Sequence, residues 1–289
     1  MEDIKILLVG CGYWGKNWYN TIKKSEYTLV GVVDPDPVIK VDVPLYDKIE
    51  EVDIEYTHVI LAVNASLHVE LAAKAKVSDK SKILVEKPCG TTIKDSKELK
   101  GTFPGYLFLY SDEYQYIKNN LDKIGTPKYW KSTRASMGPR VRSDVSIVED
   151  YMIHDLYMYH DLFYEPGKLV RVWNKHLSTE FEEPIKESSA HITLSLNNIP
   201  GHFYSSWCWP DKERKIVIHG DKGSFVWVND DLYFDDTHYD HDKLIQGSRN
   251  KIETSPLSNL ELQLKFFILG KPTQTNCVDI WQLLTKIGQ

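Results

Sequence analysis

The stretch Ile4-Lys5-Ile6-Leu7-Leu8-Val9-Gly10-Cys11-Gly12-Tyr13-Trp14-Gly15 decides the fold of the first half of the chain. Residues 4–9 are mostly apolar and predict a buried strand, while residues 16–24 predict a helix. The glycines therefore occupy a strand-to-helix turn. Such a turn brings backbone N–H groups and a helix N-terminus to phosphates, which predicts a dinucleotide-binding turn. The alternative is an ordinary glycine-rich turn of an α/β protein.

A second strand is expected at Leu29–Val33, and Asp34 follows it directly. In dinucleotide-binding units, a carboxylate about 20 residues after the glycines accepts hydrogen bonds from the adenosine ribose and disfavours a 2′-phosphate. We therefore expect NAD in preference to NADP. The alternative for Asp34 is a turn residue before Pro35. The expected cofactor-binding residues of this region are Gly10, Gly12, Tyr13, Trp14, Gly15 and Asp34.

Two more apolar runs, His58–Val63 and Lys82–Val85, predict further parallel strands, with a helix from Leu67 to about Lys76 between them. In open parallel sheets, ligands bind beyond the carboxyl ends of the strands. The residues after these runs should therefore face the cofactor. The sequence predicts an α/β, doubly wound parallel sheet of Rossmann type, with further cofactor contacts from Asn64, His68, Glu86 and Lys87.

The segment Glu149-Asp150-Tyr151-Met152-Ile153-His154-Asp155 places a carboxylate and an imidazole four positions apart. On a helix, Asp150 and His154 project from one face and can reach the same substrate hydroxyl. Oxidation of a secondary alcohol requires a base for the hydroxyl proton, and His154 is the expected base. Lys87 would stabilise the developing alkoxide, and Asp150 would orient the substrate or Lys87. Each has an ordinary structural alternative, and Asp155 competes with Asp150.

The composition excludes other classes of function. The 289 residues carry a net charge of -6 with no run of basic residues, which argues against a nucleic-acid-binding protein. The four scattered cysteines indicate neither a disulfide framework nor a metal site, so we expect a reducing cytoplasm. No apolar run approaches the roughly 18 residues that a membrane span requires, so no membrane segment is expected.

Several motifs together carry a family resemblance: the glycine turn, Leu67-His68-Val69-Glu70-Leu71-Ala72, Glu86-Lys87-Pro88 and residues 150–155. They resemble the glucose-fructose oxidoreductase / inositol dehydrogenase / MocA (Gfo/Idh/MocA) family. The resemblance implies that Lys87, Asp150 and His154 occupy the family's lysine, aspartate and histidine positions, and that Pro88 follows a cis peptide. Residues 138–145 and 206–212 are similar to the branch that oxidises nucleotide-linked sugars at C3. The substrate-binding residues expected on this basis are Lys87, Arg142, Asp150 and His154.

The resemblance also implies a second, α+β domain with an open, mostly antiparallel sheet that often forms a dimer face. We expect domains at residues 1–125 and 126–289, with the C-terminal helices packing back on the first. A homodimer or homotetramer is expected, unless those helices cover the sheet. The sequence independently supports this sheet with candidate strands at Val170–Leu177, Ala190–Leu196, His202–Trp207, Arg214–Ile218 and Ser224–Val228.

Some features depart from the family pattern. The region between Pro88 and Tyr110 is short, Tyr110–Tyr116 lacks the usual basic residues, and the residues around Asp150 are bulkier. The expected function is NAD-dependent oxidation of a sugar hydroxyl, at C3 of a nucleotide-linked hexose. The alternatives are a keto or imine reductase and a catalytically silent, NAD-responsive regulatory protein.

Overall fold

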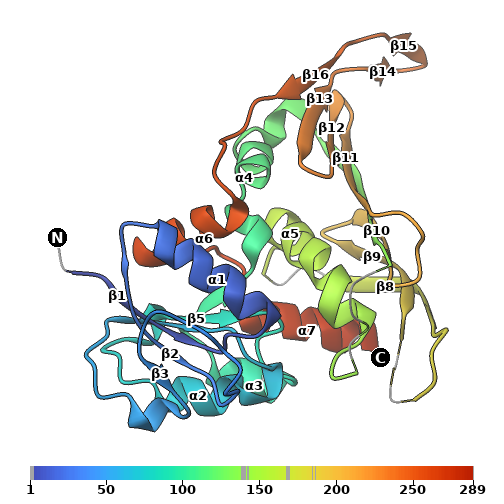
Figure 1. Ribbon diagram of the computed structural model, residues 1–289. Coiled ribbons are helices and arrows are strands. Elements are labelled where there is room, and N and C mark those ends of the chain that lie inside the picture. Colours follow the sequence, from blue (N-terminus) through green and yellow to red (C-terminus); the bar gives the residue numbers. More distant parts are fainter. Residues whose placement is uncertain are drawn as a thin grey trace. The chain divides into compact units, whose positions relative to one another are not determined.

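The computed structural model describes residues 3–137, 141, 143–166, 170–183, 185 and 187–288. They form two compact units (Figure 1). The first comprises Met1–Tyr110 and Leu257–Gln282, and the second comprises Ser111–Pro256 and Leu283–Gln289. Most of the C-terminal segment thus groups with the first unit, while the expected domain limit after residue 125 stays a prediction.

The first unit is built on a six-stranded parallel sheet with the order β3-β2-β1-β4-β5-β6. Leu7, Val59 and Leu84 of its central strands are fully buried. Burial on both faces of the sheet accounts for the nearly continuous apolar runs in the sequence. The predicted Rossmann-type sheet is confirmed. Its strands are β1 Lys5–Val9, β2 Thr28–Val33, β3 Leu45–Tyr46, β4 His58–Leu61, β5 Ile83–Glu86 and β6 Phe103–Gly105.

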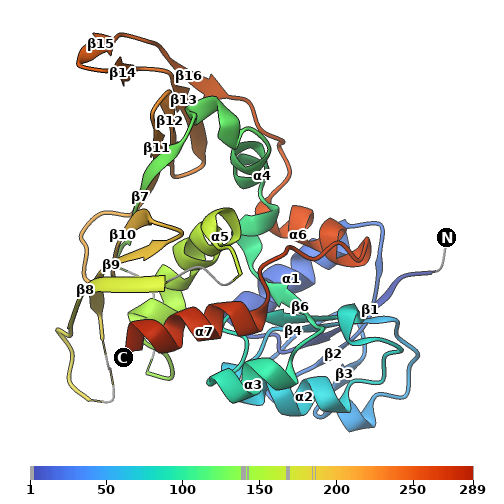
Figure 2. The same ribbon diagram turned by 180° about the vertical axis from the view of Figure 1, so that it is seen from behind.

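Helices cover both faces of this sheet, with α1 and α6 on one face and α2 and α3 on the other (Figures 1 and 2). Helix α1 begins at Tyr13 rather than at the predicted Lys16, because Gly12 is already the N-cap residue. From α6, the ring of Phe267 packs edge-on against His58 and Phe103. The helices are α1 Tyr13–Lys24, α2 His68–Lys74, α3 Ile93–Glu98, α6 Asn259–Ile268 and α7 Cys277–Gly288, with 3-10 turns at Ile49–Glu51, Ala65–Leu67, Lys80–Lys82 and Leu107–Tyr110.

The second unit contains an eight-stranded sheet with the order β16-β13-β12-β11-β7-β10-β9-β8. The pair β7–β10 is parallel and the other described pairs are antiparallel, so the expected open, mostly antiparallel sheet is confirmed. Its strands are β7 Pro127–Ala135, β8 Val170–Ser178, β9 Ser189–Leu196, β10 Ile199–Ser206, β11 Glu213–Gly220, β12 Gly223–Val228, β13 Asp231–Asp235 and β16 Arg249–Ile252, and a separate two-stranded sheet contains β14 His238–Asp240 and β15 Lys243–Ile245.

The turn between β9 and β10 is shorter than the segment Asn197–Gly201 suggests. Strand β10 already begins at Ile199, which pairs with Leu196, so only Asn197 and Asn198 form the loop. Both asparagines have positive φ, 50° and 63°. Two consecutive residues with positive φ match the right-handed twist of a hairpin, and asparagine tolerates this conformation better than most residues.

Helices α4 Asp112–Asn119 and α5 Ile153–Phe163 lie on one face of this second sheet (Figures 1 and 2). Asp161 of α5 joins them, because its carboxylate accepts hydrogen bonds from Tyr114 at 2.6 Å and from Lys118 at 2.7 Å. A 3-10 turn, Leu121–Ile124, precedes β7, and a π-helical turn, Val148–Met152, leads into α5. Within the described ranges, every helix is too short or too polar to span a bilayer.

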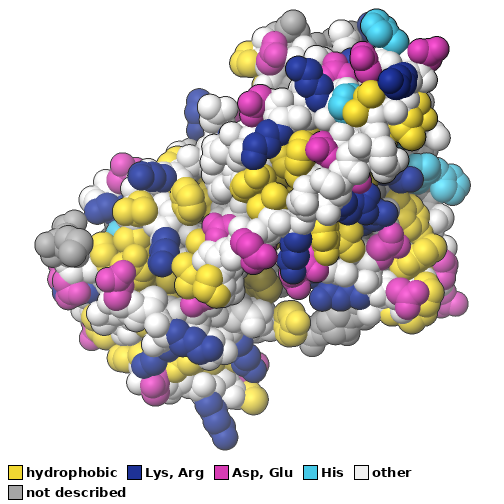
Figure 3. Space-filling view, turned by 90° about the horizontal axis from the view of Figure 1, so that it is seen from above, with side chains coloured by type: hydrophobic (Ala, Val, Ile, Leu, Met, Phe, Trp, Pro, Cys, Tyr) yellow, Lys and Arg dark blue, Asp and Glu magenta, His cyan; other side chains and the backbone are white. Residues whose placement is uncertain are grey.

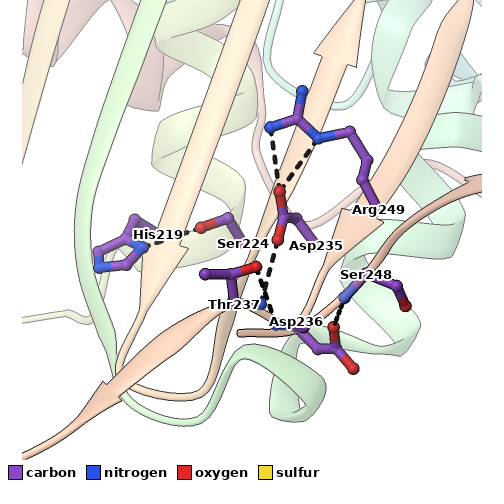
Figure 4. Close-up of polar contacts among 8 residues, drawn as sticks. His219, Ser224, Asp235, Asp236, Thr237, Ser248 and Arg249 are labelled. Atoms are coloured by element: carbon purple, nitrogen blue, oxygen red, sulfur yellow. Dashed lines mark hydrogen bonds and ion pairs between the residues drawn. The ribbon is translucent and has the colours of Figure 1, made fainter. Parts of the chain in front are cut away.

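Polar contacts fix the edge of the sheet around β13 and β16 (Figure 4). Arg249 pairs with Asp235 across these strands at 3.0 Å, and Asp235 also accepts a hydrogen bond from the backbone of Thr237 at 3.1 Å. Towards the interior of the sheet, His219 and Ser224 join β11 to β12 at 2.8 Å. Figure 3 shows acidic and basic side chains interspersed with hydrophobic ones on the face drawn there.

Candidate functional site

The glycine turn after β1 has a shape that only glycine permits at two of its three positions. Gly10 has a φ of +88°, and a Cβ there would stand 2.5 Å from the carbonyl oxygen of Ala62. A Cβ on Gly15 would stand 2.1 Å from the carbonyl oxygen of Gly10. These contacts show why α1 can begin so close to the end of β1.

Gly12 lies on the open side of the same turn. Apart from Gly12 and its two neighbours in the chain, no described atom comes within 4 Å of a Cβ built there, and no side chain caps the N-terminus of α1. The first N–H groups of a helix lack partners within the helix and favour an anion. The backbone therefore fits the pyrophosphate of a dinucleotide, with space beside Gly12 and donors at the start of α1.

Asp34 directly follows β2 and is hydrogen-bonded to the glycine turn. Its Oδ2 accepts a hydrogen bond from the backbone N–H of Cys11 at 2.6 Å, and its Oδ1 accepts one from Asp36 at 3.0 Å. The second bond is the local turn contact that was the structural alternative for this residue. Each carboxylate oxygen can accept more than one hydrogen bond, so both remain able to accept ribose hydroxyls.

Glu86 at the end of β5 is buried beneath the glycine turn. Its Oε1 accepts hydrogen bonds from the indoles of Trp14 and Trp18, both at 2.7 Å, and its Oε2 accepts one from the backbone of Lys87 at 3.2 Å. Burial raises the pKa of Glu86, although the two indole donors act in the opposite direction. Glu86 therefore ties the first turns of α1 to β5, and sequence reasoning did not identify Trp18 as its partner.

His68 is also buried, at the start of α2. Its Nδ1 accepts a weak hydrogen bond from the backbone N–H of Gly90 at 3.5 Å, and its Nε2 lies 3.2 Å from the carbonyl oxygen of Val63. This pattern fits a neutral imidazole with the proton on Nε2. His68 thus connects the segments that follow β4 and β5. By contrast, Asn64 and Tyr13 are exposed.

Lys87 follows β5 directly, and its side chain is half-buried. The Lys87–Pro88 peptide is cis, as the family resemblance implies. The indole N–H of Trp281 donates a hydrogen bond to the carbonyl oxygen of Cys89 at 2.9 Å, which anchors this segment to α7. Because the sheet is parallel, Gly10, Asp34, Asn64 and Lys87 all stand at the carboxyl edge of neighbouring strands.

In the second unit, Asp150 and His154 lie at the junction of the π-helical turn and α5. The sequence predicted a plain α-helix here, and the π turn is a local irregularity of the kind that often marks functional sites. Asp150 is buried, while His154 is half-buried. The Nδ1 of His154 lies 2.9 Å from the hydroxyl of the buried Tyr157. This bond orients the imidazole ring.

Asp155 takes part in a buried ion pair. Its Oδ1 accepts hydrogen bonds from Nη2 and Nε of Arg134 at 2.7 and 3.2 Å, and both side chains are nearly inaccessible to solvent. Asp155 is therefore a structural partner of β7. Arg142 lies outside the described residues. Sequence reasoning missed Arg134 and Tyr157, although the three-residue spacing of Tyr157 from His154 was a usable signal.

Comparisons with known proteins agree with this architecture. Residues 4–104 match a family model described as an oxidoreductase family, NAD-binding Rossmann fold, and residues 120–256 match the C-terminal alpha/beta domain of the same oxidoreductase family. No curated protein sequence gives a significant match.

Solved structures share the fold over nearly the whole chain. UDP-N-acetylglucosamine 3-dehydrogenase GnnA from Acidithiobacillus ferrooxidans has a TM-score of 0.80 and 18% identity, covering 100% of this chain and 97% of that one. An oxidoreductase from Agrobacterium radiobacter in complex with NAD+, L-tartaric acid and magnesium has a TM-score of 0.77 and 18% identity, covering 99% and 94%. Biliverdin reductase from Synechocystis sp. PCC 6803 in complex with biliverdin and NADP+ has a TM-score of 0.73 and 17% identity, covering 99% and 98%. With both of its domains matched, the chain belongs to the Gfo/Idh/MocA family of NAD-binding oxidoreductases.

Proposed function

We propose that the protein oxidises a secondary hydroxyl of a sugar with NAD, at C3 of a nucleotide-linked hexose. The observation that carries this proposal is the imidazole of His154, held through Nδ1 by Tyr157 on a helix that also carries Asp150. An imidazole oriented by a second group is the arrangement expected of a general base.

The proposed cofactor is NAD rather than NADP. Asp34 is fixed by the backbone of Cys11 and Asp36, so its carboxylate cannot swing away from the ribose position without losing two hydrogen bonds. A fixed carboxylate accepts ribose hydroxyls and disfavours a 2′-phosphate. Backbone groups around Gly10 and Gly12 would hold the pyrophosphate, with Asn64 and Lys87 at the same edge of the sheet. Tyr13 and Trp14, in the first turn of α1, complete the proposed cofactor contacts.

We expect His154, Lys87 and Asp150 to have separate roles in the reaction. Bound NAD supplies the hydride acceptor. His154 takes the hydroxyl proton on Nε2, and the ammonium of Lys87 stabilises negative charge on the substrate oxygen. Asp150 orients the substrate hydroxyls or Lys87. Glu86 and His68 remain proposed cofactor-binding residues, and their contacts would also hold the turn and strand ends from which the other cofactor contacts project.

The proposed substrate is a nucleotide-linked hexose. The name of GnnA places its reaction at position 3 of a nucleotide sugar, but at 18% identity the likeness shows the fold alone. A panel of nucleotide sugars, free sugars and polyols, assayed for NADH formation by the purified protein, tests the assignment. Turnover of a nucleotide-linked hexose with a 3-keto product supports it, whereas turnover only of free sugars or polyols contradicts it.

Two alternative functions predict different results in these assays. A keto or imine reductase would oxidise NADH with a carbonyl or imine substrate and give no NADH with any sugar. A regulatory protein would bind NAD without turnover in either direction. The presence of Lys87, Asp150 and His154 together favours an enzyme over a silent sensor.

We also propose self-association through the outer face of the second sheet. Tyr129 and His219 are in ring contact there at 5.1 Å, and Tyr204 and Trp209 at 5.8 Å, with all four side chains partly or well exposed. Burying such a face is favourable. Light scattering should show a dimer or tetramer, and a species of only 33.4 kDa would contradict the proposal. Four free, scattered cysteines support a reducing cytoplasm as the location.

A further inference from the structure

A row of polar side chains crosses the helix-covered face of the second sheet. Ser205 of β10 and Arg214 of β11 both stand directly opposite Arg134 of β7. Residues directly opposite each other on neighbouring strands point to the same face, with Cβ atoms about 5 Å apart. Arg134 reaches Asp155 of α5, so the row lies beneath the start of that helix. His154 immediately precedes Asp155 in the chain.

The charges in this row are not balanced by close contacts. Asp155 pairs with Arg134, whereas the half-buried guanidinium of Arg214 makes no hydrogen bond or ion pair with any residue that the structure describes. Burial, followed by the neighbouring charge of Arg134, lowers the pKa of Arg214. Asp230, Tyr151 and Asp155 lie near enough to act on Arg214 electrostatically, but Asp230 is exposed in the turn before β13 and Asp155 is already paired with Arg134. Among the residues that the structure describes, Arg214 thus presents a charge and up to five donors without a hydrogen-bond partner.

Other buried groups around the row also lack partners. Ser205 Oγ, Trp207 Nε1 and Asp155 Oδ2 have no hydrogen-bond partner among the described residues. The ring of Trp207 packs edge-on against Tyr151, one turn before Asp155. Buried polar groups are nearly always hydrogen-bonded in folded proteins, so several unpaired groups in one place suggest that a ligand completes them. The unpaired side-chain groups are mainly donors, which selects for an anion.

We propose that Arg214, Ser205 and Trp207 form an oxyanion-binding site that takes the diphosphate of the substrate. This inference rests on the proposed function and gives a physical reason for a nucleotide-linked rather than a free sugar. A guanidinium binds phosphate oxygens through paired, charge-assisted hydrogen bonds, and a serine hydroxyl and an indole N–H add neutral donors. The sugar would then lie towards His154, which directly precedes Asp155 on α5.

The test measures binding of inorganic pyrophosphate by calorimetry, with NAD present at saturation so that the cofactor position is filled. Arg214→Gln should weaken pyrophosphate binding about 10-fold or more, the usual effect of losing a charge-assisted hydrogen bond. Lys215→Gln is the matched control, because Lys215 is exposed and its side chain points to the opposite face of the strand. Arg214→Lys, which keeps the charge, should retain part of the affinity. Equal affinity in wild type and Arg214→Gln would overturn the site.

Further measurements distinguish failure of the oxyanion site from failure of the proposed function. Removing Arg214 relieves repulsion with Arg134, so the melting temperature of Arg214→Gln should be unchanged or higher, whereas a structural role requires a decrease. Malonate tests the source of the anion: binding as strong as that of pyrophosphate, with the same dependence on Arg214, would overturn the choice of a diphosphate.

If nucleotide sugars are oxidised equally well by wild type and Arg214→Gln, the oxyanion site fails and the proposed function stands. Pyrophosphate binding that depends on Arg214, without oxidation of any nucleotide sugar, supports the site and counts against the proposed function.

Discussion

The Nδ1 atom of His154 lies 2.9 Å from the hydroxyl of Tyr157, one turn further along α5, and Tyr157 is fully buried. If this bond positions the imidazole for proton transfer, Tyr157→Phe should lower kcat about 5- to 10-fold, the effect expected from one hydrogen bond, and leave KM nearly unchanged. Steady-state kinetics on the identified substrate provide the measurement.

Tyr239→Phe serves as the control for this substitution, because Tyr239 is 65% exposed and lies far along the chain, on β14. Its kcat should equal that of the wild type. A merely structural role for Tyr157 predicts a lower melting temperature with activity that follows the folded fraction. That outcome would remove Tyr157 from the mechanism.

Gly12 and Gly15 make opposite predictions about the cofactor turn. Gly15→Ala would place a Cβ 2.1 Å from the carbonyl oxygen of Gly10, so this variant should lose stability or fail to fold. Gly12→Ala meets no described atom within 4 Å and should fold normally, yet its methyl group would occupy the space expected for pyrophosphate. Thermal melting measures the stability of both variants, and calorimetric titration measures their affinity for NAD. Tight NAD binding by folded Gly12→Ala would show that the pyrophosphate does not approach this residue.

Asp34 should determine cofactor preference. The wild-type protein should bind NAD more tightly than NADP, and Asp34→Ala should narrow the difference by removing both an acceptor for ribose hydroxyls and a negative charge. The variant also loses the hydrogen bond to Cys11, so its melting temperature must be recorded on the same preparation. Equal or tighter binding of NADP by the wild type would reject the assignment of NAD.

Glu86 should make folding stability depend on pH. Burial raises its folded-state pKa above the ordinary value of 4.5, so the folded protein binds this proton more tightly than the unfolded chain does. The resulting stabilisation is complete below the ordinary pKa and is lost as pH rises through the raised, folded-state pKa. Glu86→Gln mimics the protonated form and lacks this dependence.

The measurement is the free energy of unfolding of wild type and Glu86→Gln, by denaturant titration from acidic to neutral pH. The wild type should lose stability relative to the variant as pH rises. Glu26→Gln, at an exposed glutamate, should run parallel to the wild type. A constant difference between wild type and Glu86→Gln over this range would contradict the pKa shift.

Local patterns predicted much of the first unit. The run from Ile4 to Gly15 contains a strand, a turn and the start of a helix within one short stretch, so its hydrophobic period and glycines specify the fold directly. The partners of Glu86 could not be predicted in this way. Trp14 and Trp18 are 72 and 68 positions away in sequence, and only the packing of α1 on the sheet brings them to this carboxylate.

The second unit was less predictable for a different reason. Its central strand β7, Pro127–Ala135, was not anticipated, because exposed lysines such as Lys128 and Lys131 interrupt its apolar pattern. Yet Trp130 on this strand is almost completely buried. The pairing of Asp155 with Arg134 likewise depends on how α5 lies over β7. The spacing of Asp150 and His154 predicted their shared helical segment, but not the π turn within it.

Turnover of His154→Ala on the identified substrate decides whether His154 is the base of an NAD-dependent oxidation. Turnover should fall about 100-fold or more, the usual contribution of general-base catalysis, while NAD affinity stays near that of the wild type. Lys87→Met, which keeps the length of the side chain but removes the ammonium, should behave in the same way. Near-wild-type turnover by a folded His154→Ala protein would show that His154 is not the base.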